Sequence, residues 1–147
     1  IFVDVEPLTY NIDWKKIEEK ITSKTRAIIP VHLLGLPATM DPILELSKKY
    51  NLKIIEDSAE SMFATYNDRK VGSLGDAAAF STYVAHFLVT GVGGFATTSD
   101  PDLAVTMRSL MNHGRDSIYI SCSDDEGLGQ EKLHEVVAKR FKFVHVG

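Results

Sequence analysis

Residues 41–61 read DPILELSKKYNLKIIEDSAES and contain the helix and the strand that decide the fold. The opening Asp-Pro pair is a strong helix start, because aspartate accepts the free N–H groups of a first turn and proline fits the first helical position. We expect this helix to run to about Tyr50, with Asn51 as its stop. The apolar run over residues 52–56 then predicts a buried strand that leads into Asp57.

The same alternation of strand-like and helix-like stretches continues on both sides of this segment. Alternating strands and helices in one chain favour an α/β architecture. We expect strands over residues 1–5, 25–31, 76–83 and 95–98, helices over 13–21, 101–113 and 131–140, a turn at Asn67-Asp68, and loops at 91–94 and 115–130.

The composition excludes several classes of protein. The 147 residues are 44% hydrophobic, which fits one domain with a real core. The net charge of -4 leaves no basic excess for binding nucleic acid. No membrane span or signal peptide is expected, so a cytoplasmic location is the default. Cys122 is the single cysteine, which excludes a disulfide framework, and no metal site is expected. The chain begins at Ile1, and we expect both ends to be cut from a longer protein.

The side chains that close the strands are candidates for ligand binding, because ligands of open α/β sheets gather beyond the carboxyl ends of the strands. Asp57 is placed to meet a cationic ligand atom, or to cap the next segment. Ser81 is suited to holding a phosphate oxygen, or to forming a turn. His86, in the string YVAHFL, is on that string alone more often a packed histidine than a catalyst. The positions to inspect are His32, Asp57, residues 81–83, His86 and the glycine loop at 91–94, which suits either an anion or a hairpin turn.

Two long strings resemble the DegT-type family of sugar aminotransferases, which are pyridoxal-phosphate enzymes of fold type I. They are IIPVHLLGLPATMDPILELSKKYNLKIIEDSAES at 28–61 and KVGSLGDAAAFSTYVAHFLVTGVGGFATTSDPDLAVTMRSLMNHGRD at 70–116. The order and spacing of ED, GSLGD, FS, GVGG and NHGR make the resemblance specific. It implies that residues 1–147 are the central part of the coenzyme-binding large domain, a mostly parallel sheet flanked by helices. It further implies that the N-terminal segment and the small C-terminal domain are absent, and that the full-length protein is a homodimer.

The resemblance also implies roles for individual residues. Asp57 would hold the pyridinium nitrogen of the coenzyme, Ser81 would bind its phosphate, and Glu60 would lie near its 3-hydroxyl, where the family usually has glutamine or histidine. His86 departs from the pattern, because the aminotransferases carry there the lysine that forms the Schiff base. Imidazole has no primary amine, so pyridoxal 5′-phosphate or pyridoxamine 5′-phosphate would be held noncovalently. Histidine remains a competent acid–base near neutral pH.

One branch of the family, the 3-dehydratases of 4-keto-6-deoxy nucleotide sugars, carries histidine at this position in a similar Ala-His context. The leading hypothesis is therefore B6-dependent 3-dehydration of a nucleotide-linked 4-keto sugar, with His86 as the acid–base, in deoxysugar or polysaccharide biosynthesis. A sugar transaminase that uses glutamate and another lysine, such as Lys70, is the second hypothesis. The third is an inactive member of the family or a non-enzymatic α/β binding module.

Overall fold

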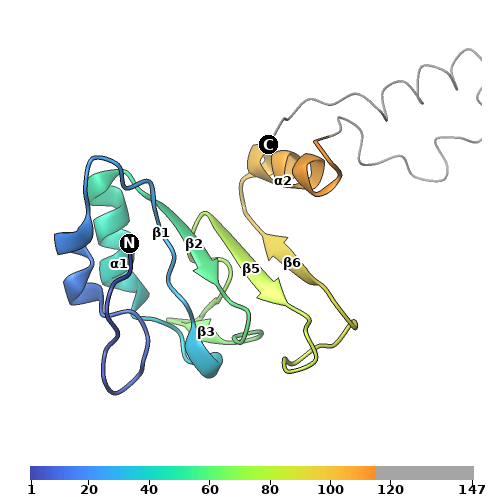
Figure 1. The fold of residues 1–147 in the computed structure, drawn as a ribbon, viewed down its shortest axis with the longest axis horizontal. Coiled ribbons are helices and arrows are strands. Elements are labelled where there is room, and N and C mark those ends of the chain that lie inside the picture. Colours follow the sequence, from blue (N-terminus) through green and yellow to red (C-terminus); the bar gives the residue numbers. More distant parts are fainter. Residues whose placement is uncertain (115–147) are drawn as a thin grey trace, which may run out of the picture. The chain divides into compact units, whose positions relative to one another are not determined.

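The computed structural model describes residues 1–114, and residues 1–99 contain a four-stranded sheet (Figure 1). The sheet order is β1-β2-β5-β6. Strands β1, β2 and β5 run parallel, and β6 is antiparallel to β5. This confirms the mostly parallel α/β sheet expected from the sequence. The strands are β1 (Ala27–Ile28), β2 (Lys53–Asp57), β5 (Ala77–Ser81) and β6 (Gly94–Thr97), and a separate hairpin pairs β3 (Thr65–Tyr66) with β4 (Arg69–Lys70).

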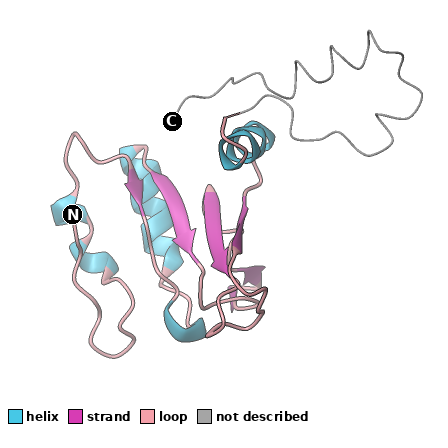
Figure 2. Ribbon diagram, turned by 45° about the vertical axis from the view of Figure 1, so that its right-hand side comes forward, coloured by secondary structure: helices cyan, strands magenta, loops and turns pink. Residues whose placement is uncertain are grey.

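Helix α1 (Met40–Tyr50) packs on β1 and β2, as Figure 2 shows. It begins two residues earlier than expected, because Thr39 and not Asp41 occupies the N-cap position and Asp41 lies in the first turn. Asn51 ends the helix in the left-handed conformation, with φ 51°, which confirms the predicted stop. The apolar core between helix and sheet contains Ile17, Ile28, Ala38, Met40, Ile43, Leu52, Ile54, Val71 and Leu74.

Strand β2 has one buried face and one partly exposed face. Ile54 and Glu56 are 1% and 0% exposed, whereas Ile55 is 39% exposed and Asp57 is partly buried. Successive side chains of a strand point to opposite faces of the sheet. Glu56 therefore lies on the core side, and Asp57, the next residue, lies on the other side.

Two predicted elements near the N-terminus are wrong. Residues 1–5 form no strand, and Val5 makes only an isolated bridge with Ile12. A ladder does not form there because the Val5 N–H donates to the side chain of Asp4 instead of to a neighbouring strand. The expected helix over 13–21 is replaced by two short 3-10 turns, η1 (Trp14–Lys16) and η2 (Glu18–Lys20). Ile17 lies between these turns and enters the core, so the apolar spacing identified the buried residue but not the helix type.

Residues 1–99 form one compact unit, and a second unit begins at Asp100. The second unit opens with α2 (Pro101–Met111). Its predicted start is confirmed, because the Asp100 side chain accepts hydrogen bonds from the N–H groups of Asp102 and Leu103, and proline follows the cap directly. Among residues 1–114, no helix is long and apolar enough to cross a membrane. The predicted loop at 115–130, with Cys122, and the predicted helix at 131–140 lie outside the described residues.

Candidate functional site

Two of the predicted site residues close neighbouring parallel strands. Asp57 is the last residue of β2, and Ser81 is the last residue of β5. The two strands are paired, with Asp57 opposite Ala79, so both side chains leave the same carboxyl edge of the sheet. This edge is where open α/β sheets bind ligands.

Asp57 also performs the local role that its residue type favours. Its Oδ1 atom accepts a hydrogen bond from the N–H of Ala59, at 3.2 Å. Within residues 1–114 its second carboxylate oxygen makes no hydrogen bond, which leaves that oxygen available to a cationic partner. Ser81 is similar, since its Oγ atom accepts from the N–H of Tyr83 at 3.1 Å and its own O–H remains able to donate.

The glycine loop at 91–94 ends the longer connection, residues 82–93, between the antiparallel strands β5 and β6. Thr82 and Thr90 hold its base through a hydrogen bond between their hydroxyls at 2.7 Å, and the N–H of Thr82 donates to the Gly93 carbonyl. The loop is therefore part of a hairpin connection, and its suitability for an anion stays a prediction from the sequence.

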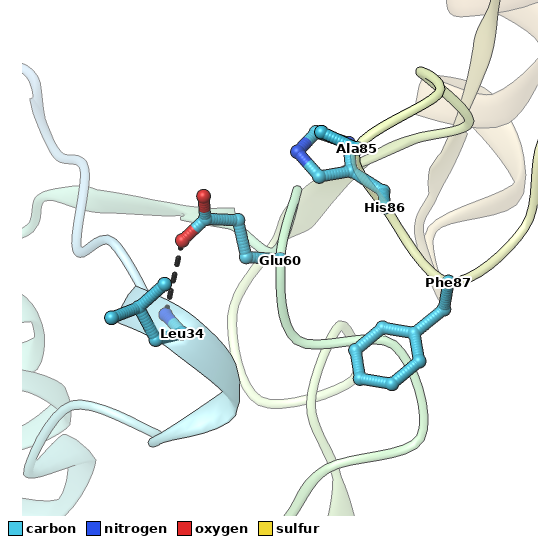
Figure 3. Close-up of a pocket in the computed structure, with 5 residues that line it drawn as sticks. All are labelled: Leu34, Glu60, Ala85, His86 and Phe87. Atoms are coloured by element: carbon cyan, nitrogen blue, oxygen red, sulfur yellow. Dashed lines mark hydrogen bonds between the residues drawn. The ribbon is translucent and has the colours of Figure 1, made fainter.

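Glu60 and His86 line one pocket of about 330 Å³, together with Leu34, Ala85 and Phe87. Figure 3 shows the His86 ring directed from its loop toward the side on which Glu60 lies. The Glu60 Oε2 atom accepts a hydrogen bond of 3.0 Å from the N–H of Leu34, in the turn η3 (Leu33–Gly35). Leu34 adopts the left-handed conformation there, with φ 51°, which is unusual for a branched residue. Three segments distant in sequence thus meet around this carboxylate and imidazole.

The imidazole of His86 is held by packing and not by hydrogen bonds. Its Nδ1 atom is buried and has no hydrogen-bond partner among the described residues. Tyr83 contacts it edge-on, with the ring centroids 6.0 Å apart. Leaving a buried polar nitrogen unpaired costs about 1–3 kcal/mol, so its persistence needs an explanation. The ring itself lines the pocket that also contains the Glu60 carboxylate, so the imidazole is placed to receive a ligand atom or a proton there.

These side chains fit a phosphorylated pyridine coenzyme. The strand ends offer a carboxylate at Asp57 and a hydroxyl at Ser81, and the pocket offers a second carboxylate at Glu60 and the imidazole of His86. None of the five residues that line the pocket carries an amine. Lys70, the lysine of the transaminase hypothesis, lies exposed on β4. No group of His, Cys, Asp and Glu side chains within residues 1–114 could hold a metal ion.

Sequence reasoning missed three residues of this region. Leu34 and Phe87 line the pocket, and nothing in their local strings marks them. Glu56 forms a buried pair with His32, which was singled out as a strand-closing residue but is 0% exposed and does not line the pocket. The signal for Glu56 was its spacing, because it shares the two-residue period of Ile54 and so falls on the core face.

The chain is similar to several known enzymes, two of which are named for GDP-linked sugars. GDP-perosamine synthase of Caulobacter vibrioides is 50% identical over 116 residues, which is 79% of this chain and 31% of that protein. The aminotransferase of Psychrobacter cryohalolentis superimposes with a TM-score of 0.76 at 41% identity, covering 78% of this chain and 29% of that one. The E. coli GDP-4-keto-6-deoxy-D-mannose-3-dehydratase, solved with bound hydrated PLP, superimposes with a TM-score of 0.81 at 32% identity, covering 99% of this chain and 37% of that one.

The chain thus spans about a third of the length of these proteins. Its sheet and helices match part of the fold type I structures, as the sequence predicted. Residues 1–138 match the model of one family. The chain belongs to the DegT/DnrJ/EryC1/StrS aminotransferase family.

Proposed function

We propose that the full-length protein is a vitamin B6-dependent enzyme that modifies a nucleotide-linked 4-keto sugar, and that its reaction is 3-dehydration. The observation that carries the proposal is His86, which stands in the pocket where the family's lysine is expected and keeps an unpaired Nδ1 atom. The names of the Caulobacter relative and the E. coli dehydratase both contain a GDP-linked sugar, which supports the substrate class. The dehydratase also aligns with nearly the whole chain, whereas the Psychrobacter aminotransferase aligns with 78% of it.

The proposal extends to the parts of the protein beyond this chain. Residues 1–147 form the central part of a large coenzyme-binding domain, and a further N-terminal segment, a small C-terminal domain and a second subunit complete the site. The partners are the nucleotide-linked 4-keto sugar, glutamate as the source of the amine, and a second copy of the chain.

Some residues of this chain bind the coenzyme, and His86 transfers a proton. When bound in its amine form, the coenzyme supplies an amine for the sugar ketone, a ring that takes up an electron pair, and the reducing equivalents that loss of the C3 hydroxyl consumes. The Asp57 carboxylate accepts a hydrogen bond from the protonated ring nitrogen and keeps the proton there. The Ser81 hydroxyl donates to a phosphate oxygen, and Glu60 accepts from the 3-hydroxyl. The His86 imidazole, half-buried and beside the pocket, accepts the proton that must leave carbon.

Amino transfer from glutamate is the second candidate function, favoured by the 41% identity to the Psychrobacter aminotransferase. It would use the same Asp57 and Ser81, but it lacks the amine that holds the coenzyme covalently in that chemistry. Among the described residues, no lysine lines the pocket that contains His86.

The test uses the full-length protein with nitrogen-15 glutamate and a nucleotide-linked 4-keto-6-deoxy sugar. Mass spectrometry should find a product that has lost the C3 oxygen and carries no nitrogen-15. Incorporation of nitrogen-15 into the sugar at a normal rate would show that the enzyme is a transaminase. Borohydride reduction should leave the wild type without a covalent coenzyme adduct, whereas His86→Lys should acquire one. If pyridoxamine phosphate does not bind at all, the protein is a non-enzymatic module.

A further inference from the structure

A buried carboxylate lies one residue before the predicted coenzyme ligand. The Glu56 side chain is 0% exposed, and each of its oxygens accepts two hydrogen bonds. Four bonds are close to the full acceptor capacity of a carboxylate, so Glu56 has nothing left to offer a ligand. The donors are Gly72 N at 2.8 Å and His32 Nε2 at 3.1 Å on Oε2, and Leu74 N and Gly75 N, both at 2.7 Å, on Oε1.

The hydrogen bonds of His32 fix its tautomer. The Nδ1 atom accepts a hydrogen bond of 3.0 Å from the N–H of Ala38, so Nδ1 carries no proton. The proton of the neutral ring is therefore on Nε2, which donates to Glu56. A doubly protonated ring would direct an N–H at the N–H of Ala38, and His32 is consequently excluded as a proton carrier.

Glu56 is likewise fixed in its ionised form. Burial by itself raises the pKa of this carboxyl, but the hydrogen bonds from His32 and from three backbone N–H groups outweigh burial and hold the pKa below its ordinary value. The buried pair is thus a carboxylate beside a neutral imidazole, which makes it a framework and not an acid–base couple.

The framework holds the backbone on both sides of the Asp57 side chain. The N–H of His32 donates to the Asp57 carbonyl at 2.9 Å, and the N–H of Asp57 donates to the Pro30 carbonyl at 2.9 Å. Glu56 anchors this same segment through the His32 ring, from the core side of the sheet. Asp57 projects to the opposite side, because neighbouring strand residues alternate.

The same carboxylate also holds the chain that enters β5. The N–H groups of Gly72, Leu74 and Gly75 precede Asp76, whose own N–H donates to the Ile54 carbonyl. The other end of β5 carries Ser81. The two strands that present the predicted coenzyme ligands are therefore tied to one buried oxygen pair.

We propose that Glu56, together with His32, is a positioning residue that fixes Asp57 at the end of β2 from the far side of the sheet. This inference rests on the proposed function, because it assumes that Asp57 holds the ring nitrogen of the coenzyme. Neither Glu56 nor His32 touches the coenzyme, and neither transfers a proton.

Glu56→Gln in the full-length protein is the sharpest test. Glutamine keeps the shape of the side chain, but either orientation of its amide turns the NH₂ group toward two donors. Glu45→Gln, on the exposed side of α1, is the matched control. His32→Asn is a second variant, since it retains an acceptor for Ala38 and removes the donor to Glu56 together with part of the buried ring volume.

Two measurements separate positioning from folding and from the proposed function. Amide hydrogen exchange at His32 and Asp57 should accelerate about tenfold or more in Glu56→Gln, less in His32→Asn, and not in Glu45→Gln. Nitrogen-15 NMR of ring-labelled pyridoxamine phosphate should show a smaller protonated fraction of the ring nitrogen in Glu56→Gln than in the wild type.

Three outcomes decide the matter. Wild-type exchange at both amides in a folded Glu56→Gln or His32→Asn variant would overturn the inference. Faster exchange with an unchanged ring-nitrogen signal would also overturn it, because Asp57 would then not depend on the framework. Failure of the wild type to bind pyridoxamine phosphate would reject the proposed function instead, and the exchange comparison would still decide whether Glu56 fixes the strand end.

Discussion

The ring of Phe80 stacks on the ring of Phe95 across strands β5 and β6, with the centroids 4.8 Å apart and the planes inclined by 15°. The two residues face each other in the antiparallel register. The stack limits the movement of Phe80, whose ring tip lies over Gly72. Aromatic packing on this hairpin therefore fixes the position of the turn that donates to Glu56.

Gly72→Ala should lower the free energy of unfolding by about 2–4 kcal/mol. A methyl group there would lie 2.4 Å from Phe80 Cζ, and the residue has φ +89°, so steric overlap adds to backbone strain. Gly91→Ala is the matched control, because Gly91 has φ +81° and nothing within 4 Å. Gly91→Ala should lower the free energy of unfolding only by the backbone strain, about 1 kcal/mol. Urea unfolding of the full-length protein measures both, and equal losses would contradict the role of the stack.

The Glu56 carboxylate should make stability depend on pH on the acid side. Its pKa is lower in the folded than in the unfolded protein, because its hydrogen bonds outweigh the opposing effect of burial. Its contribution is thus fully present above the ordinary value of 4.5 and is lost as pH falls through the lower folded value. Unfolding curves at a series of pH values should show a shallower acid slope for Glu56→Gln than for the wild type, and an unchanged slope would contradict this role of the carboxylate.

Removing the carboxylate of Glu60 should release the turn at Leu34. Leu34 holds a left-handed conformation that costs about 1 kcal/mol, and its N–H donates to Glu60 Oε2. In Glu60→Ala the Leu34 amide should exchange faster and the substrate KM should rise. Glu60→Gln retains an acceptor and should preserve the slow exchange. Similar exchange in both variants would mean that the turn is stable without this bond.

His86→Asn should lower kcat by about 100- to 10,000-fold, the usual contribution of a general acid–base. Asparagine cannot transfer the proton, but it leaves the strand ends at Asp57 and Ser81 untouched. The Kd of pyridoxamine phosphate should therefore change little, and steady-state kinetics beside a binding titration separates the two effects. A large loss of coenzyme affinity with an unchanged kcat would assign His86 to binding alone.

Local signals in the sequence predicted the elements that have clear ends. Asn51 stops α1, and Asp100 with Pro101 starts α2, because capping and backbone preference act within a few residues. The strand over residues 1–5 failed for the opposite reason, since an apolar string forms a strand only where a neighbouring strand pairs with it.

The site was predictable only where the sheet itself places it. Asp57 and Ser81 could be brought together from the sequence, because parallel strands align their carboxyl ends. The pocket shared by Glu60 and His86 depends on the path of two irregular segments, and the left-handed Leu34 has no local signal beyond the glycine that follows it. Contacts between loops that are distant in sequence depend on tertiary packing, and a local pattern of residue types does not predict them.

The alternation along β2 directs Glu56 to the core and Asp57 to the opposite side of the sheet, and this makes the packing of the core sensitive to the register of the strand. A slip of one residue in the register of β2 would exchange the two carboxylates, and it would bring Asp57 to the turn of Gly72 and Leu74. Aspartate is one methylene shorter and could not reach all four donors, so the core would close badly. A well-packed core therefore requires the register of β2 that directs Asp57 to the opposite side of the sheet. A molecule that folds with this core has Asp57 in the correct orientation.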